Sequence, residues 1–177
     1  MRTFDLILLA FLTFANLWLS WWISIRQKRF HGIFRFLSFE CIILLVLFNY
    51  PVWFRDPLCW YQVISWILLT GSAIVAYFGF YQLYRYGKPG DQMEETTQLV
   101  TTGLYRYIRH PLYLSLILGG FGCMMKDPVW IPVALSVINL IALYMTAMVE
   151  ENEMLKKFGT EYALYIKETK MFVPFVL

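Results

Sequence analysis

The sequence predicts an all-α integral membrane protein: a single domain, built as a bundle of about five transmembrane helices with a C-terminal amphipathic helix. Two properties lead to this prediction. Of the 177 residues, 59% are hydrophobic, 19% are aromatic and only 15% are charged, whereas a soluble domain carries about 25% charged residues. The apolar residues also form continuous runs without the alternation of a transmembrane β-barrel, so helices are the expected spanning elements.

Five apolar segments are candidates to cross a bilayer. They are Leu6–Ile25, Phe36–Tyr50, Val63–Tyr84, Pro111–Met125 and Trp130–Val149. The first continues into Arg26 without a small-residue cleavage site, so we expect a membrane anchor and not a cleaved signal. The second and fourth are short, and we expect each to gain a helical turn from its cytoplasmic flank. Three glycines would let the fourth helix pack closely on a neighbour: Gly119, Gly120 and Gly122.

These segments divide the domain into four regions. Three spans occupy residues 1–84, a loop occupies 85–110, a helical hairpin occupies 111–149 and a tail occupies 150–177. Apolar residues recur at helical spacing in the tail, at Leu155, Phe158, Tyr162 and Tyr165. Lys and Glu lie between them, which predicts an amphipathic helix that Gly159 could interrupt.

The distribution of basic residues predicts the orientation of the bundle. Of the 15 Lys and Arg residues, 12 lie in the first gap, the third gap and the tail. The positive-inside rule places these regions in the cytoplasm and the N-terminus outside, which requires an odd number of spans. We therefore expect a multi-pass protein of a prokaryotic cell membrane, surrounded by membrane lipids, with its active site facing the cytoplasm. The charge pattern indicates no nucleic-acid partner, and the oligomeric state is open.

The segment 98–113 has a pattern that a plain membrane flank does not explain. Gly103 favours a backbone turn, and Pro111 suits the first turn of the fourth helix. His110 and Tyr113 then lie about one turn apart on one side of that helix. A basic flank with an aromatic belt would explain the Arg and Tyr residues, but not the Gly, His and Pro at these positions.

Two adjacent acids lie near this segment in the predicted fold. Glu150 and Glu151 follow the fifth span, and the hairpin returns them to the membrane face where the fourth span begins. Acidic side chains at a helix C-terminus interact unfavourably with the helix dipole, so they need a partner. Two partners remain open: a bound cationic or hydroxyl-rich ligand, or a salt bridge to Arg106 or Arg109.

Other polar residues have simpler interpretations. Glu40 lies inside the second span, where an acid is costly, and it is a functional candidate unless it pairs with Arg35 or Arg26. Cys59 and Cys123 both fall on the outer side, so a disulfide between them is open. No Cys or His spacing is typical of a metal site, and no metal is expected.

The second half of the chain carries a paired signature, LVTTGLYRYIRHPLY followed by EENEMLKKFGTEYALYIKET and a closing Pro174. In this signature the chain resembles the isoprenylcysteine carboxyl methyltransferase family, which is related to the phospholipid methyltransferases. The resemblance extends from Gln98 to Pro174. It implies a membrane enzyme that uses S-adenosyl-L-methionine, with the cofactor at the cytoplasmic end of the last two spans.

The resemblance also implies a set of site residues. Those expected to bind the cofactor are Gln98, Leu99, Val100, Tyr105, His110, Pro111, Tyr113 and Glu150. We expect Arg109 and Glu150 to take part in catalysis. Aromatic faces and carboxylates suit the sulfonium and the ammonium of the cofactor, which agrees with these residue types.

One position departs from the family's pattern and concerns the methyl acceptor. The resembled enzymes carry an arginine one helical turn before the cofactor-binding glutamate, where it meets the acceptor carboxylate. This chain has Thr146 there. We predict that Thr146 lines the acceptor site, the alternative being a hydrogen bond to its own helix backbone. Arg106 or Arg109 could supply the missing charge.

The leading hypothesis is a membrane methyltransferase whose lipophilic acceptor enters from the bilayer. The alternatives are a phospholipid N-methyltransferase and a non-catalytic membrane protein that keeps the fold. Alignment of the reactants and exclusion of water would be the protein's main contribution. An amine acceptor would also need a base, for which Glu150, Glu151 or His110 is suited.

Overall fold

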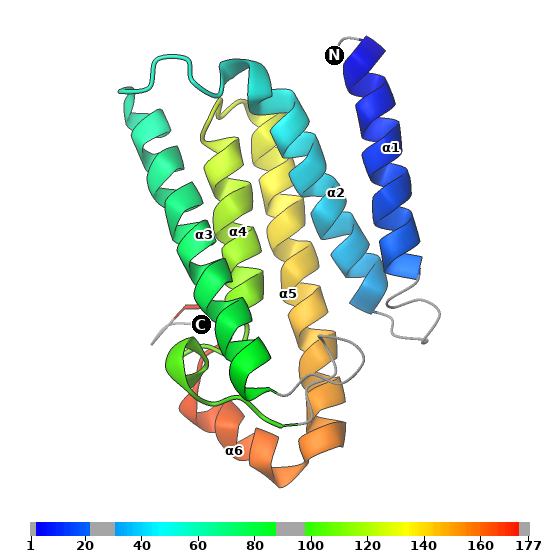
Figure 1. The fold of residues 1–177 in the computed structure, drawn as a ribbon, viewed down its shortest axis with the longest axis vertical. Helices are drawn as coiled ribbons and strands as arrows, with labels where there is room; N and C mark the ends of the chain where they lie inside the picture. Colours follow the sequence, from blue (N-terminus) through cyan, green and yellow to red (C-terminus); the bar gives the residue numbers. More distant parts are fainter. Residues whose placement is uncertain (1–2, 22–30, 88–97, 174–177) are drawn as a thin grey trace.

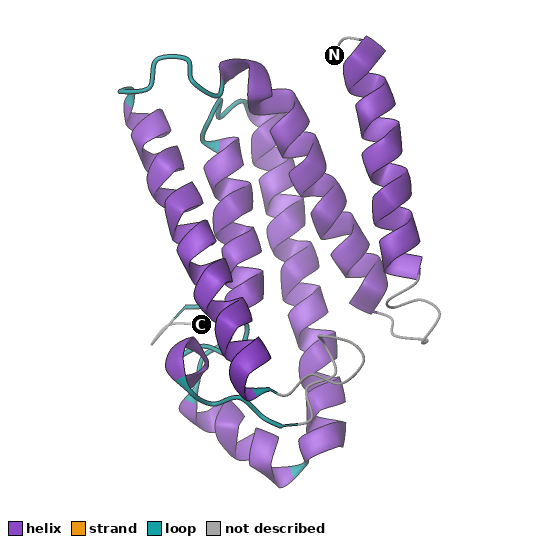
Figure 2. Ribbon diagram, viewed as in Figure 1, coloured by secondary structure: helices purple, strands orange, loops and turns teal. Residues whose placement is uncertain are grey.

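The computed structural model describes residues 3–21, 31–87 and 98–173 (Figure 1). In these ranges the chain forms six α-helices and two short 3-10 turns, with no β-strand (Figure 2). The helices are α1 (Thr3–Ser20), α2 (His31–Asn49), α3 (Trp60–Tyr86), α4 (Pro111–Met124), α5 (Trp130–Phe158) and α6 (Thr160–Glu168). The turns are η2 (Tyr50–Val52) and η3 (Gly103–Arg106). The predicted all-α architecture is confirmed.

Four of the described helices, α1, α2, α3 and α5, are long and apolar enough to cross a membrane. The apolar helix α4 has only 14 residues and runs beside α3 and α5 (Figure 1). A helix of that length spans about 21 Å, less than a hydrocarbon core of about 30 Å. By helix length and hydropathy the chain is a multi-pass integral membrane protein. The expected end of the first span, Ile25, lies outside the described residues.

The two short predicted spans differ at their starts. α2 begins at His31, before Phe36, and so gains the expected turn. α4 begins at Pro111 and gains none, so that expectation was wrong for this helix. The reason is Pro111 itself, because a residue that precedes proline avoids the helical conformation. His110 accordingly has φ −123° and ψ 61°, and its N–H donates to the Met171 carbonyl at 3.1 Å.

Helix α5 runs beyond the expected end of the fifth span. It continues to Phe158, so Glu150 and Glu151 lie inside the helix and not at its C-terminus. Gly159 then ends the helix with a φ of 57°, a conformation that favours glycine. The predicted interruption at Gly159 is confirmed, and α6 turns back across the end of the bundle (Figure 1).

Small residues bring α4 close to its neighbours α3 and α5. A Cβ atom at Gly122 would lie 2.8 Å from Leu69 Cγ of α3. A Cβ atom at Gly120 would lie 2.5 Å from Asn139 Nδ2 of α5. Neither position has room for a side chain, so the close approach predicted for the fourth helix is confirmed.

Polar side chains join α1 to α2. Glu40 of α2 accepts hydrogen bonds from Thr13 Oγ1 at 2.5 Å and from Asn16 Nδ2 at 3.2 Å. Two donors of the neighbouring helix thus satisfy an acid in apolar surroundings, which gives Glu40 a structural role. Of its two considered partners, Arg26 lies outside the described residues and Arg35 lines the cavity described below.

The end of the bundle away from α6 closes around Lys126, in the turn between α4 and α5. Lys126 is 1% exposed, and its Nζ donates to Gln62 Oε1 at 3.0 Å and lies 3.6 Å from the centre of the Trp66 ring. The hydrogen bond and the cation–π contact tie the predicted hairpin to α3. Cys59 and Cys123 are both free, so the disulfide considered above is not formed.

Candidate functional site

A cavity of about 410 Å³ lies at the end of the bundle that carries α6. Helices α2 to α6 all contribute to its lining, together with the segment that leads into α4. Predicted site residues that line this cavity are Leu99, Val100, Tyr105, Arg109, His110, Tyr113 and Glu150. The fold therefore brings together two stretches that are well separated in the sequence.

Two predicted cofactor residues lie outside the cavity lining. Gln98 is exposed, and its N–H donates to the Gly87 carbonyl at 3.4 Å. Pro111 is fully buried and faces Gly79 of α3. Pro111 thus shapes the start of α4 without reaching the cavity.

Thr146 is the third predicted site residue that does not line the cavity. It is 0% exposed, and its hydroxyl donates to the Ala142 carbonyl at 2.8 Å. Thr146 thus makes the hydrogen bond considered as the alternative, to the backbone of its own helix, and its predicted role at an acceptor site stays a prediction. The rotation of α5 turns this position into the bundle.

The segment after α6 holds the segment before α4 by backbone hydrogen bonds. The Arg109 N–H donates to the Lys170 carbonyl at 2.8 Å, and the Lys170 N–H donates to the Tyr107 carbonyl at 3.1 Å. With the bond from His110 to Met171, these form a short parallel bridge. The tail thereby sets the backbone position of His110.

On its other side this segment is anchored to α3 through η3. The Leu104 N–H donates to Gln82 Oε1 at 2.8 Å. Gly103 has a φ of 63°, and a Cβ atom there would overlap the Gln82 amide. The turn predicted at Gly103 is confirmed, and it requires glycine for both reasons.

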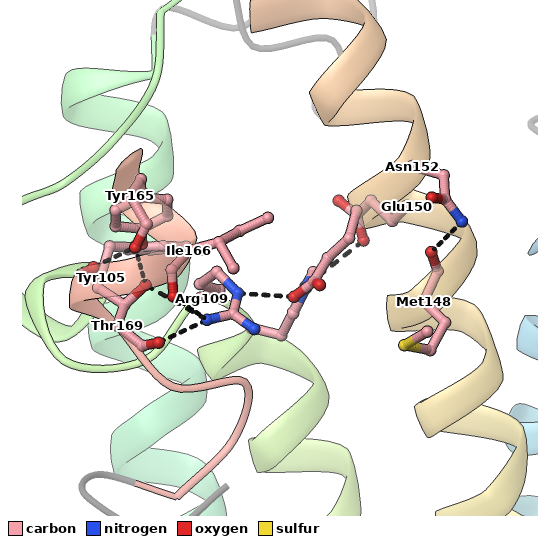
Figure 3. Close-up of polar contacts among 10 residues, drawn as sticks. Tyr105, Arg109, Met148, Glu150, Asn152, Tyr165, Ile166 and Thr169 are labelled. Carbon is pink, nitrogen blue, oxygen red and sulfur yellow. Dashed lines mark hydrogen bonds and ion pairs between the residues drawn. The ribbon is translucent and has the colours of Figure 1, made fainter. Parts of the chain in front are cut away.

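The Arg109 side chain connects three elements (Figure 3). Its Nε lies 2.6 Å from Glu151 Oε1 of α5, and both side chains are largely buried, at 8% and 13% exposure. Its Nη1 donates to the carbonyls of Thr169 at 2.6 Å and Ile166 at 3.3 Å, where a cation also interacts well with the dipole of α6. The two partners left open for Glu150 and Glu151 were a ligand and a salt bridge. Glu151 has the salt bridge, with Arg109.

His110 lies between the two acids. Its Nδ1 is 3.7 Å from Glu150 Oε2, and its Nε2 is 3.3 Å from Glu151 Oε1. The ring stacks on Tyr113 with centres 5.4 Å apart, and the Phe172 ring lies 6.2 Å away. Nε2 is buried, and its partner is the Glu151 carboxylate. The acids on both sides and the stacked Tyr113 ring thus hold the imidazole of His110 at the cavity.

Two tyrosines bring neutral phenols to the cavity. Burial, and then the charge of Glu150, raise the pKa of Tyr105. Burial, and then the charges of Glu151 and Glu150, raise the pKa of Tyr162. Both phenols therefore stay protonated at neutral pH. The Glu150 side chain is 31% exposed, so its carboxylate is accessible to a ligand while Glu151 is not.

The sequence analysis did not predict that α2 and α3 contribute to the cavity. Arg35 and Phe39 of α2 and Phe80 and Leu83 of α3 line it. An apolar transmembrane helix shows similar residues on every face, so its periodicity does not reveal which face meets a cavity. Arg35, a charge inside α2, was the available signal.

Comparison with known proteins adds a family and two relatives. Residues 60–161, more than half of the chain, match the family model described as phospholipid methyltransferase. The chain is 23% identical over 175 residues to a methanethiol S-methyltransferase of Crocosphaera subtropica, covering 89% of this chain and 66% of the relative. It is 24% identical over 169 residues to methanethiol S-methyltransferase 1 of Bradyrhizobium diazoefficiens, covering 88% and 58%. The chain thus spans less than two thirds of the length of these relatives.

Proposed function

Since this chain belongs to the phospholipid methyltransferase family, we propose that its cavity binds S-adenosyl-L-methionine and that the protein transfers the methyl group to a lipophilic acceptor. The observation that carries this proposal is the convergence of Glu150, His110 and Tyr105 on one largely apolar cavity. When bound, S-adenosyl-L-methionine supplies a methyl group on a positively charged sulfur.

The residues of the cavity fit this cofactor. The Glu150 carboxylate is accessible and suits an ammonium or ribose hydroxyls. The neutral phenols of Tyr105 and Tyr162 can donate hydrogen bonds, and the stacked rings of His110 and Tyr113 suit a planar base or a sulfonium. Leu99 and Val100, beside Tyr105, add apolar surface, as the resemblance implies.

The protein's own contribution is positional. The bonds from the tail and from Arg109 hold His110 and the start of α4 in one geometry. Apolar side chains such as Phe39, Phe80 and Leu116 exclude water. Alignment in a water-poor site accelerates a transfer between two bound reactants. In this proposal Arg109 acts by positioning, and Glu150 contacts the cofactor.

A lipophilic acceptor would enter between α2 and α3. Both helices line the cavity, but α3 packs along α4 and α2 packs along α5, on opposite sides of the central pair (Figure 1). In this proposal the acceptor reaches the cavity through the gap between these two helices. Phospholipid amines and thiols are both candidate acceptors, the first from the family description and the second from the names of the two relatives.

The proposed orientation places the cavity toward the cytoplasm of a prokaryotic cell. The start of α1 and the helix α6 lie at opposite ends of the bundle, as an odd number of crossings requires (Figure 1). The first gap, the third gap and the tail hold 12 of the 15 basic residues in the sequence, which favours the α6 end as the cytoplasmic one. Soluble S-adenosyl-L-methionine would then reach the cavity from the cytosol.

Calorimetric titration with S-adenosylhomocysteine in detergent tests the cofactor site. We expect saturable binding at micromolar ligand and transfer of labelled methyl groups to at least one member of a panel of lipophilic thiols, aminophospholipids and prenylcysteines. Absence of both binding and transfer would support the alternative of a non-catalytic membrane protein and would refute the proposal.

A further inference from the structure

We propose that Arg106 and Glu168 bind the amino-acid end of S-adenosyl-L-methionine in a second hollow, which lies between η3 and α6 and adjoins the cavity. Arg106 binds the carboxylate of that end and Glu168 binds its ammonium. This inference rests on the proposed function, because it divides the same cofactor between two compartments.

The hollow has a volume of about 560 Å³. The chain from Leu99 to Arg106 forms one wall, and residues of α6 form the other. Leu99 and Tyr165 line both the hollow and the cavity, so the two spaces adjoin at these residues. Tyr165 is held in place there, because its phenol donates to the Tyr105 carbonyl at 2.5 Å (Figure 3).

The cavity itself offers a poor site for a carboxylate. Among the described residues that line it, the arginines are Arg35 and Arg109. Arg109 is bound to Glu151 at 2.6 Å and to carbonyls at the end of α6, and Arg35 already interacts within the protein. His110 lies between two acids, one of which is the accessible Glu150. A carboxylate removed from water needs a cation of its own, so the hollow is the better place for it.

Arg106 is the cation of the hollow. Its side chain is exposed and lies 6.0 Å from the centre of the Tyr107 ring, and it makes no ion pair within the described part of the chain. A guanidinium stays protonated at neutral pH and binds a carboxylate through two parallel hydrogen bonds. Thr101 and Thr102 on the same wall add hydroxyl donors.

The opposite wall supplies the anion for the ammonium. Glu161 and Glu168 both line the hollow from α6, and neither has an ion pair with another described residue. They lie about 10 Å apart along the helix, so one ammonium contacts only one of them. Glu161 is in the first turn of α6, where the helix dipole favours an acid without a ligand. Glu168 is the last residue of α6, where the dipole disfavours an acid and a cation beside it is favourable.

The hollow therefore matches both charges of an amino-acid end, one from each wall. The cavity then receives the adenosine and the sulfur, and Glu150 binds the ribose hydroxyls. The assignment uses side chains of η3 and α6 that lie outside the cavity lining.

Two ligands that differ at the amino-acid end test this inference. S-adenosylhomocysteine carries that end, whereas methylthioadenosine keeps the adenosine and the sulfur but lacks it. The wild type, Arg106→Gln, Glu168→Gln and Lys167→Gln are titrated with both ligands in detergent. Lys167 is the control, because it is an exposed cation of α6 that lines neither space.

We expect Arg106→Gln and Glu168→Gln each to weaken S-adenosylhomocysteine binding about 3- to 10-fold, a moderate effect because both side chains are exposed. Both variants should bind methylthioadenosine like the wild type, and Lys167→Gln should leave both affinities unchanged. Salt screens exposed charges, so raising its concentration should weaken binding of S-adenosylhomocysteine to the wild type more than binding of methylthioadenosine.

The outcomes separate this inference from the proposed function. If the wild type binds neither ligand, the proposed function fails. If it binds both, but Arg106→Gln and Glu168→Gln leave S-adenosylhomocysteine binding unchanged or weaken both ligands equally, the role of the hollow is overturned. Equal salt dependence of the two ligands in the wild type overturns it as well, and this measurement decides even if the variants do not fold.

Discussion

Adjacent residues divide the roles at the site. Glu150 and Glu151 follow one another in α5, so their side chains leave the helix about 100° apart. One carboxylate is accessible at 31% exposure, and the other is buried at 13% against Arg109. The first is thus suited to a ligand and the second to the fold. Two predictions separate these roles.

Replacing His110 or Glu150 by alanine should weaken S-adenosylhomocysteine binding. A hydrogen bond to a charged group contributes about 1.5–3 kcal/mol, which corresponds to roughly 10- to 150-fold in affinity. Calorimetric titration in detergent measures this. Glu161→Ala is the matched control, because Glu161 is an exposed acid on α6, and its affinity should equal that of the wild type. Wild-type affinity in both site variants would contradict the assignment.

Replacing Glu151 by glutamine should act on stability. The change leaves the buried Arg109 without its carboxylate at 2.6 Å. Breaking a buried ion pair from one side costs about 3–5 kcal/mol, and this pair is slightly exposed, so we expect the lower part of that range. Arg109→Gln combined with Glu151→Gln should cost less than the sum of the single changes. Additive losses of unfolding free energy would show that the two residues act independently.

At the scale of helices, close approach of backbones holds α4 in place. α4 is too short to fill the bilayer alone, and at its glycines side chains of α3 and α5 pack directly against its backbone. These glycines lie in the second half of α4, whereas the cavity is lined by residues of its first turns. A matched pair of glycine substitutions tests this packing.

Gly122→Ala should destabilise the bundle, whereas Gly71→Ala should not. A Cβ atom at Gly122 meets Leu69 Cγ at 2.8 Å and its backbone nitrogen at 3.1 Å, while one at Gly71 meets Leu118 Cδ1 at an ordinary 3.9 Å. Overpacking costs about 1–3 kcal/mol, and alanine at Gly71 gains helix propensity of up to about 1 kcal/mol. Thermal unfolding in detergent measures both. Equal melting temperatures for the two variants would refute the close contact.

At the scale of the whole molecule, the C-terminal segment completes the site. Phe172 is 4% exposed and belongs to a core cluster with Ile117, Leu143, Ala147 and Met171. Its ring also borders His110 at 6.2 Å. The segment after α6 therefore anchors the segment before α4. The site depends on contacts between these two segments.

Phe172→Ala should lower both stability and cofactor affinity. Truncating a buried Phe costs about 3–5 kcal/mol, and here it also frees the His110 ring on one side. Val173→Ala is the control, because Val173 is 44% exposed and should behave like the wild type. Thermal unfolding and S-adenosylhomocysteine titration on the same samples report the two effects. A loss of stability with unchanged affinity would show that the tail supports the bundle but not the site.

The family match agrees with the predicted relation to membrane methyltransferases, and the activity and cofactor of this chain are proposals. It names the phospholipid methyltransferases, related to the family that the motifs resemble, so the acceptor remains a proposal. The apolar runs identified every helix of the bundle because hydropathy is a property of contiguous residues. The turn at Gly103 and the helix end at Gly159 could also be predicted, because a positive φ favours glycine itself.

The sequence alone thus determined the membrane class, the helices and many of the residues of segment 98–113 that line the cavity. Only the tertiary structure decided which side chains reach the cavity. Thr146 bonds to Ala142 of its own helix, and Arg109 binds Glu151. Arg35 of α2 lines the cavity, which the sequence did not predict. The physical reason is that these outcomes depend on how helices far apart in the sequence rotate and pack against one another. Local composition does not specify those rotations, because in an apolar bundle many faces of a helix are equally hydrophobic.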